Sequence, residues 1–325
     1  MVVDIARGRQ ILFVGGKGGT GKTSLSSAIA YARADAGQRV LLVSTDPAHS
    51  LGHVWDRQLT DTPSRIVTTG DGYIDAVEVD PDATVERHFA AVEKTMYRML
   101  PERQHSAIRE HLNTARSAPG SQEAATLERI AQIIEFGLAD YDAVVFDTAP
   151  TGTTMHLLAL PERLTNWMQT LLANRDRSDR FAAAARGLVG KTEETSSADA
   201  ELRRNLLARR DRFALMRRTV QDASVSGFII ATLAEKLPVA ETLEMAGQLD
   251  RLGIDIASVV VNRRSPADAG PLLAQRRAHE EEYVRQLRAG LGDVPLTQVP
   301  LLAREISGTD SIGELAGLLG PGARA

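Results

Sequence analysis

Hydrophobic and polar positions alternate with two different periods along the chain. Short runs rich in Val, Ile and Leu are separated by longer stretches in which hydrophobic residues recur every three or four positions. Runs such as residues 143–146 and 258–261 are hydrophobic on both faces, which is typical of central strands in a parallel sheet. The pattern predicts an α/β fold, with a mostly parallel, doubly wound sheet covered by helices on both faces. The expected strands lie near residues 10–15, 39–44, 73–79, 142–147, 226–232, 256–261 and 296–299.

Two segments interrupt the alternation. Residues 82–138 and 152–222 contain no convincing strand and have the periodicity of amphipathic helices. We expect them to form one helical subdomain, inserted into a single domain that spans residues 1–325. Such hydrophobic stripes are usually core, and the alternative is a surface that binds an apolar client. One stripe contains Val85, Phe89, Val92, Met96 and Met99, and another contains Leu157, Leu160, Leu164, Met168 and Leu171.

The first expected strand leads into a glycine-rich segment, residues 15–23, that matches the phosphate-loop pattern G-x-x-x-x-G-K-[ST]. Its glycines let backbone N–H groups surround a polyphosphate, Lys22 reaches the β and γ phosphates, and the Thr23 hydroxyl can ligate Mg²⁺. The helix expected over residues 22–36 directs its positive dipole end at the same anion. We therefore expect ATP and Mg²⁺ as cofactors. The expected binding residues are Gly16, Gly18, Gly19, Thr20, Gly21, Lys22, Thr23 and Ser24.

A second lysine, Lys17, lies inside the same loop. A loop this tight has one lysine position that points into its cradle, so Lys17 is expected to point away from the phosphates that Lys22 binds. The pattern K-G-G-x-G-K-T resembles the deviant phosphate-loop ATPases, in which this lysine crosses a dimer interface to the other subunit's phosphates. The resemblance implies that Lys17 is catalytic in trans and that the protein is a homodimer. The plain alternative is a solvated lysine at a loop edge.

Two further expected strands end in an aspartate, Asp46 and Asp147. Because the carboxyl ends of parallel strands meet at one edge of the sheet, both carboxylates should lie beside the phosphate loop. Hydrolysis of a γ-phosphate needs a metal that offsets charge and a group that orients water. Asp147 suits the metal role and Asp46 the role of orienting water. Thr23, Asp46 and Asp147 are thus the candidate metal ligands, and Asp46, Lys17 and Lys22 the candidate catalytic residues.

Together these motifs resemble the ArsA-type ATPase family, which includes arsenical-pump ATPases and ATPases that target tail-anchored proteins. The family's D-P-A-H-S-L motif is present at residues 46–51, and D-T-A-P-T-G-H-T at residues 147–154, with Thr153 in place of histidine. The resemblance implies that Asn262 contacts adenine and that a loop beginning at Pro300 and Leu301 closes over the base. Asn262 can also be read as a residue that caps a turn at a strand end.

Composition narrows the possible functions. The chain has no cysteine, which excludes the thiolate sites through which family members bind arsenite or a shared zinc. Its net charge of −4 gives no support for nucleic acid as a partner. No window approaches eighteen consecutive hydrophobic residues, so we expect no stable membrane insertion and a cytoplasmic location.

The leading hypothesis is a homodimeric, Mg²⁺-dependent ATPase that drives binding and release of an apolar helical client, most plausibly a tail-anchored helix. Three alternatives stay open. The chain could be the ATPase subunit of an anion or arsenical efflux system, with a membrane-protein partner and no cysteine metalloid site. It could be a partitioning ATPase that resembles ParA or MinD. It could also be a nucleotide-gated binding module with negligible turnover, for which the only hint is Thr153.

Overall fold

The computed structural model describes residues 2, 8–46, 50–99, 102–116, 120–149 and 197–320. These residues belong to two compact units. The first unit spans Met1–Asp80, Ile133–His156 and Arg218–Ala325, and the second spans Pro81–Gln132 and Leu157–Arg217. The second unit overlaps the two expected insertions, although most of the second insertion lies outside the described residues.

The first unit is built on a sheet that has eight strands within the described part of the chain, in the order β3-β4-β2-β5-β1-β6-β7-β8. Every neighbouring pair is parallel except β3 and β4. The predicted α/β fold class is therefore confirmed. The strands are β1 (Ile11–Gly16), β2 (Arg39–Ser44), β3 (Ser64–Thr69), β4 (Gly72–Glu78), β5 (Ala143–Asp147), β6 (Ser226–Leu233), β7 (Ile256–Arg264) and β8 (Leu296–Pro300).

The edge strand β3 was not among the expected strands. It pairs with β4 as a hairpin, and Gly70 occupies the turn with a φ of 54°. Only Ile66 of this strand is buried, because β3 lies at the edge of the sheet. Its sequence therefore lacks the hydrophobic run that predicts the central strands.

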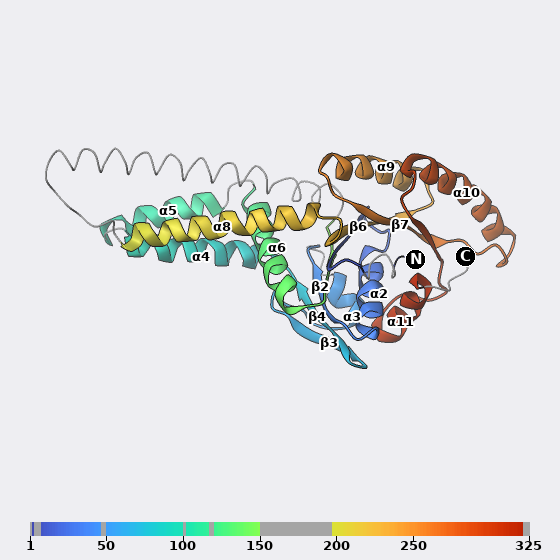
Figure 1. The fold of residues 1–325 in the computed structure, drawn as a ribbon, viewed down its shortest axis with the longest axis horizontal. Helices are drawn as coiled ribbons and strands as arrows, with labels where there is room; N and C mark the ends of the chain where they lie inside the picture. Colours follow the sequence, from blue (N-terminus) through green and yellow to red (C-terminus); the bar gives the residue numbers. More distant parts are fainter. Residues whose placement is uncertain are drawn as a thin grey trace. The chain divides into compact units, whose positions relative to one another are not determined.

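Helices cover both faces of the sheet (Figure 1). Helix α2 (Lys22–Asp35) and helix α11 (Gly308–Leu319) pack together on one face, and α9 (Lys236–Arg251) and α10 (Pro271–Leu291) pack together on the other. The short helix α3 (Ser50–Trp55) lies beside α2. A hydrophobic core lies between α2, α11 and the sheet. It includes Leu12, Val14, Leu25, Ile29, Leu42, Val145, Val260 and Ile312.

The described part of the second unit is helical. It contains α4 (Pro81–Met99), the 3₁₀ turn η1 (Glu102–Gln104), α5 (His105–Arg116), the first part of α6 (Ser121–Asp140) and most of α8 (Ser197–Gln221). The hydrophobic stripe on α4 divides along its length, since Val85 is buried whereas the side chain of Met96 is 37% exposed. The stripe expected at residues 157–171 lies outside the described residues.

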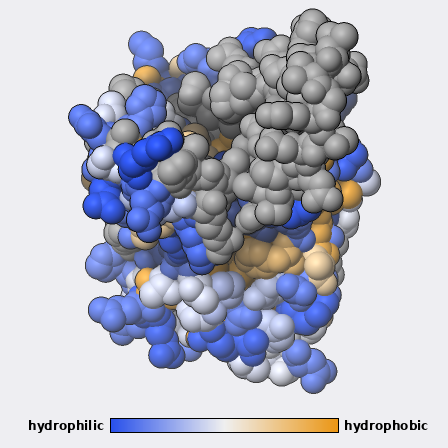
Figure 2. Space-filling view, turned by 90° about the vertical axis from the view of Figure 1, so that its left-hand side faces the viewer, coloured by the Kyte–Doolittle hydropathy of each residue, from blue (hydrophilic) through white to orange (hydrophobic). Residues whose placement is uncertain are grey.

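Charged and polar residues dominate the surface view in Figure 2, where hydrophobic side chains gather in one limited area. Among the helices that the structure describes, none combines the length and the hydrophobicity needed to cross a bilayer.

Candidate active site

The phosphate-loop segment connects β1 to α2 at the carboxyl edge of the sheet. The loop is closed by the carbonyl of Lys17, which accepts hydrogen bonds from Thr20 Oγ1 at 2.8 Å and from Lys22 Nζ at 3.3 Å. Lys22 is thereby buried against its own loop. The amino end of α2 begins directly after Gly21, so its first N–H groups are directed at the space that the loop encloses.

Two glycines of the loop are required by close neighbours. Gly16 has a φ of 145°, and a Cβ there would lie 2.1 Å from the carbonyl oxygen of Ala231 on β6. Gly21 has a φ of 90°, and a Cβ there would lie 2.3 Å from Nδ2 of Asn262 on β7. By contrast, a Cβ at Gly18 or Gly19 would meet nothing within 4 Å. The loop is therefore anchored at its two ends and open in its middle, as a phosphate cradle requires.

Asp147, the last residue of β5, is the most unusual charged group at this edge. Its side chain is fully buried, and within the described residues neither of its carboxylate oxygens has a hydrogen-bond partner. Burial raises the pKa of Asp147 to about 7, the nearby carboxylates of Asp46 and Glu78 contribute to this increase, and the Thr23 hydroxyl and the Lys22 ammonium oppose it. A buried carboxylate whose oxygens accept no hydrogen bond destabilises the protein unless a cation neutralises its charge, and the neighbouring Lys22 and Thr23 do so only in part, so this site fits Mg²⁺.

We expect the substitution Asp147→Asn to stabilise the ligand-free protein. The native state holds the Asp147 proton up to about pH 7, whereas the unfolded chain loses it near pH 4. The stability of the unchanged protein therefore falls as the pH rises between these values. At pH 8 the variant should melt at least about 2 °C higher, and the gain should vanish near pH 4.

Thermal melting at both pH values tests this expectation, with Asp142→Asn as a control, because Asp142 pairs with Arg39 at an exposed site. The same Asp147 variant should lose the additional rise in melting temperature that Mg²⁺ gives in the presence of ATP. Equal melting of the variant and the unchanged protein at pH 8 would contradict the expectation.

The other candidate metal ligands lie close to Asp147. The Thr23 hydroxyl is 3.0 Å from Ser50 Oγ at the start of α3, which connects the phosphate loop to the segment after β2. Asp46 is half-buried, and its backbone N–H donates to Ser44 Oγ at 3.3 Å. Among the described residues, no cluster of three or more histidine or acidic side chains could hold a metal by itself. A Mg²⁺ ion here would therefore need oxygen ligands from its substrate as well.

Lys17 takes a direction different from that of Lys22. Its ammonium lies 2.9 Å from Oε1 of Glu241 on α9, and the two side chains are 36% and 32% exposed. The carbonyl of Lys17 faces the loop while its side chain leaves it. The sequence pattern predicted that the Lys17 side chain points away from the phosphate loop, but it did not predict Glu241 as its partner.

At the far end of the site, both polar atoms of the Asn262 side chain are engaged. Its Nδ2 donates to the carbonyl of Thr20 at 2.9 Å, and its Oδ1 accepts from the N–H of Arg263 at 2.9 Å. Asn262 thus fastens β7 to the phosphate loop, and it retains one further N–H and one further lone pair for a ligand. Leu301 follows β8 with a 44% exposed side chain, and its N–H donates to the carbonyl of Arg264 at 2.8 Å.

Three residues at this edge had no role in the sequence prediction. Ser50 contacts Thr23, Glu241 binds Lys17, and Glu78 influences Asp147. All three had a signal without an assigned role, since Ser50 lies within the motif at residues 46–51, Glu241 with Thr242 matches the pattern of the family that the sequence resembles, and Glu78 is an acidic residue at the end of a hydrophobic strand. Residues 47–49 and 150–154, which include Thr153, lie outside the described part of the chain.

Comparison with known proteins identifies the family of this chain. A model of the anion-transporting ATPase family matches residues 9–320. Over 309 residues the chain is 29% identical to ATPase ASNA1 homolog 1 of Paramecium tetraurelia, covering 95% of this chain and 91% of that protein. It is 30% identical over 304 residues to ATPase GET3A of Arabidopsis thaliana, covering 93% and 81%. It is 31% identical over 314 residues to ATPase ARSA2 of Chlamydomonas reinhardtii, covering 94% and 82%.

The family match extends over nearly the whole described fold and includes the phosphate loop, both aspartates and Asn262. The chain is therefore an ATPase that belongs to the anion-transporting ATPase family.

Proposed function

We propose that the chain acts as a homodimer that hydrolyses ATP to ADP and phosphate, and that this cycle drives binding and release of an apolar helical client. The observation that carries the dimer is the separation of the two loop lysines. Lys22 is buried against the carbonyl of Lys17, whereas the Lys17 ammonium lies outside the cradle on Glu241. A lysine that points away from its own cradle is placed to serve the phosphate of a second subunit, as in the deviant phosphate-loop ATPases that the sequence resembles.

The contact with Glu241 does not prevent such a role. Both side chains are about one third exposed, and an exposed ion pair of this kind contributes only about 0–1 kcal/mol. Transfer of Lys17 to a triphosphate, which carries a higher negative charge, therefore costs little. Glu241 holds the lysine at the edge of the molecule from which it would cross to a second copy.

The remaining residues divide the work within one subunit. The loop N–H groups and Lys22 bind the phosphates, and Asp147 with Thr23 would hold Mg²⁺. When bound, this ion would offset the negative charge of the phosphates. Asp46 is suited to orient the attacking water, because its carboxylate is close enough to Asp147 to raise the pKa of that residue. Asn262 and the segment that begins at Pro300 and Leu301 would hold the adenine.

A client surface is supported by the second unit. Met96 is exposed on α4 although it continues the stripe that begins with the buried Val85. An exposed flexible methionine can adapt to helices of different sequence. We propose that α4 contributes to the surface that receives an apolar helix.

A substitution on this surface tests the client role. Met96→Asp should weaken, by about tenfold or more, the binding of a hydrophobic helical peptide in the presence of ATP, because a charge in an apolar contact must be desolvated. Fluorescence anisotropy with a labelled peptide of about twenty apolar residues provides the measurement. Lys94→Asp, on another face of the same helix, should leave binding unchanged. If Met96→Asp binds normally and melts normally, α4 is not the client surface.

A second function is favoured by the family description, which refers to transport of anions. The chain would then power a membrane-protein partner instead of carrying a client. Because the sequence contains no cysteine, such an ATPase could not be activated by arsenite through thiolate ligands. Intact ATP hydrolysis by the unchanged protein, without any ATP-dependent binding of the hydrophobic peptide, would support this second function.

A further inference from the structure

The carboxyl end of β7 contains an irregularity beside the nucleotide edge. Val261 pairs with Gln298 of β8, and the next paired residues are Arg264 and Pro300. Two residues of β7, Asn262 and Arg263, therefore lie opposite the single residue Val299. This is a β-bulge, and Arg263 within it has a φ of 53°, a left-handed conformation that is unfavourable for residues other than glycine.

The bulge begins at Asn262 on the side of β8, whereas on the side of β6 Asn262 pairs in regular register with Leu233. An extra residue bends its strand locally, and bulges are common next to active sites. Here Asn262 reaches the carbonyl of Thr20 in the phosphate loop, and it also accepts the N–H of Arg263. The bulge ends at Arg264, whose carbonyl receives the N–H of Leu301. The base end of the site therefore depends on the position of Arg264.

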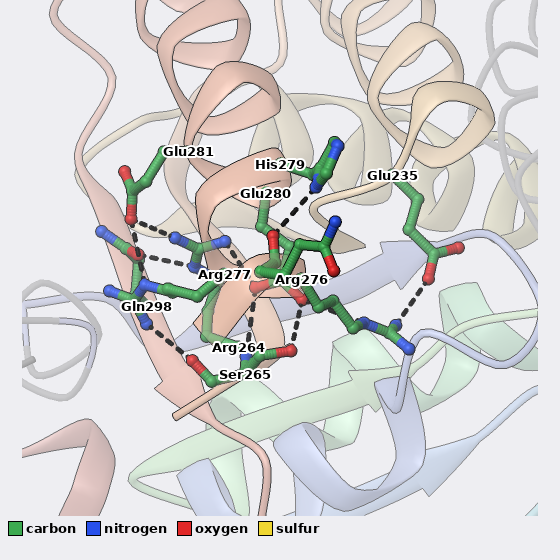
Figure 3. A network of polar contacts seen from close by, with 10 residues as sticks. Glu235, Arg264, Ser265, Arg276, Arg277, His279, Glu280, Glu281 and Gln298 are labelled. Atoms are coloured by element: carbon green, nitrogen blue, oxygen red, sulfur yellow. Dashed lines mark hydrogen bonds and ion pairs between the residues drawn. The ribbon is translucent and has the colours of Figure 1, made fainter. Parts of the chain in front are cut away.

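Arg264 is held by an unusual set of buried contacts (Figure 3). Its side chain is 1% exposed, and each of its three nitrogens has a different partner. Nε donates to Gln298 of β8 at 2.8 Å, Nη1 contacts Glu280 of α10 at 2.7 Å, and Nη2 contacts Glu281. The planar guanidinium is thus fixed in direction as well as in place.

Glu280 completes the arrangement. It is 5% exposed and accepts hydrogen bonds from the backbone and hydroxyl of Ser265, at 3.1 and 2.7 Å. Arg276 contacts Glu280 at 3.2 Å and Glu235, the residue before α9, at 2.9 Å. The network therefore joins the end of β7, strand β8 and the residue before α9 to α10, as Figure 3 shows.

These buried charges are not needed to stabilise the end of the strand, because hydrophobic residues could do so equally well. A buried ion pair is often no more stabilising than hydrophobic residues of the same size, because both charges lose their hydration. What such a network supplies is a defined orientation. Here the network fixes the orientation of the β7 bulge, which contains Asn262, and of the backbone at Leu301.

We propose that Arg264 and Glu280 are positioning residues for the base-binding end of the nucleotide site. They hold the bulge so that Asn262 and the Leu301 segment are arranged before a nucleoside binds, and they reach the phosphate loop only through the hydrogen bond from Asn262 to Thr20. The inference rests on the proposed nucleotide site and adds two residues that act on base recognition without touching the ligand.

The test compares ATP with inorganic tripolyphosphate, which occupies the phosphate loop but has no base. Arg264→Lys keeps the charge but cannot hold three partners in one plane, so we expect its Kd for ATP to rise by about tenfold. Its Kd for tripolyphosphate should rise much less, because the bulge reaches the phosphate loop through the single contact between Asn262 and Thr20, and its kcat at saturating ATP should not change. Glu280→Gln, which keeps the shape of the side chain, should give a smaller loss in the same direction.

Val284→Ala is the matched control, because Val284 is fully buried on the same helix and its loss lowers stability without touching the bulge. Its ratio of ATP to tripolyphosphate affinity should equal that of the unchanged protein.

Three outcomes bear on the proposal itself. If the binding of ATP and the binding of tripolyphosphate weaken in parallel in the Arg264 and Glu280 variants, or if neither changes, the positioning role is wrong. If Arg264→Lys does not melt cooperatively, the ratio of ATP to tripolyphosphate affinity of Glu280→Gln alone tests the positioning role. Failure of the proposed function would instead appear as absence of ATP hydrolysis by the unchanged protein.

Discussion

Replacement of Lys17 by alanine should lower ATP hydrolysis by about 10³-fold or more while leaving the Kd for ATP within about threefold. The reason is the separation of tasks between the two lysines of the loop. Lys22 remains to bind the phosphates of its own subunit, and the lost ammonium is the one that would neutralise transition-state charge across a dimer. Steady-state hydrolysis and equilibrium binding of a fluorescent ATP analogue measure the two quantities. Lys236→Ala, which removes an exposed lysine at the start of α9, should change neither.

Mixing two inactive variants distinguishes action in trans from action in cis. A dimer of one Lys17→Ala subunit and one Asp46→Asn subunit contains one site with both residues intact. An equal mixture should therefore recover about a quarter of the unmodified activity, since half of the dimers are mixed and each has one active site. If the mixture stays inactive although the subunits exchange, Lys17 does not act across an interface.

Asp46→Asn should reduce kcat by about 10²-fold or more and change the Kd for ATP only a few-fold, because a group that orients water contributes to the transition state more than to binding. Single-turnover hydrolysis, compared with nucleotide binding, separates these effects. Asp56→Asn is a suitable control, since Asp56 is exposed just after α3 and asparagine tolerates its left-handed φ of 49°. A parallel loss of binding and turnover in Asp46→Asn would mean that Asp46 mainly holds the metal-bound nucleotide.

The central part of the fold could be predicted from the sequence because its signals are local. A strand of six buried residues, a glycine loop and a helix start follow one another at residues 11–23, and each is recognisable without knowledge of its neighbours. The same holds for Asp147, which ends a strand hydrophobic on both faces. The edge strand β3 has no such signal, because solvent covers much of it and its residues need not be hydrophobic.

Pairings between distant residues could not be predicted in the same way. Lys17 and Glu241 are 224 positions apart, and Asn262 and Thr20 are 242 apart. Nothing in the composition of either segment specifies the other. The bulge at Arg263 is similarly invisible, since a non-glycine residue with positive φ is stabilised by surrounding contacts and not by its own preference.

The position of β1 in the sheet has a consequence for how the protein is made. The first strand of the chain lies between β5 and β6, so neither of its edges can form hydrogen bonds until residues 143–147 and 226–233 have left the ribosome. The phosphate loop is therefore synthesised early, but the strands that flank β1 and hold the loop in place are synthesised much later. Pairings over such distances slow folding and leave hydrophobic strands uncovered during synthesis. Nascent chains of this protein thus have a prolonged need for chaperone protection, and they gain affinity for ATP only late in translation.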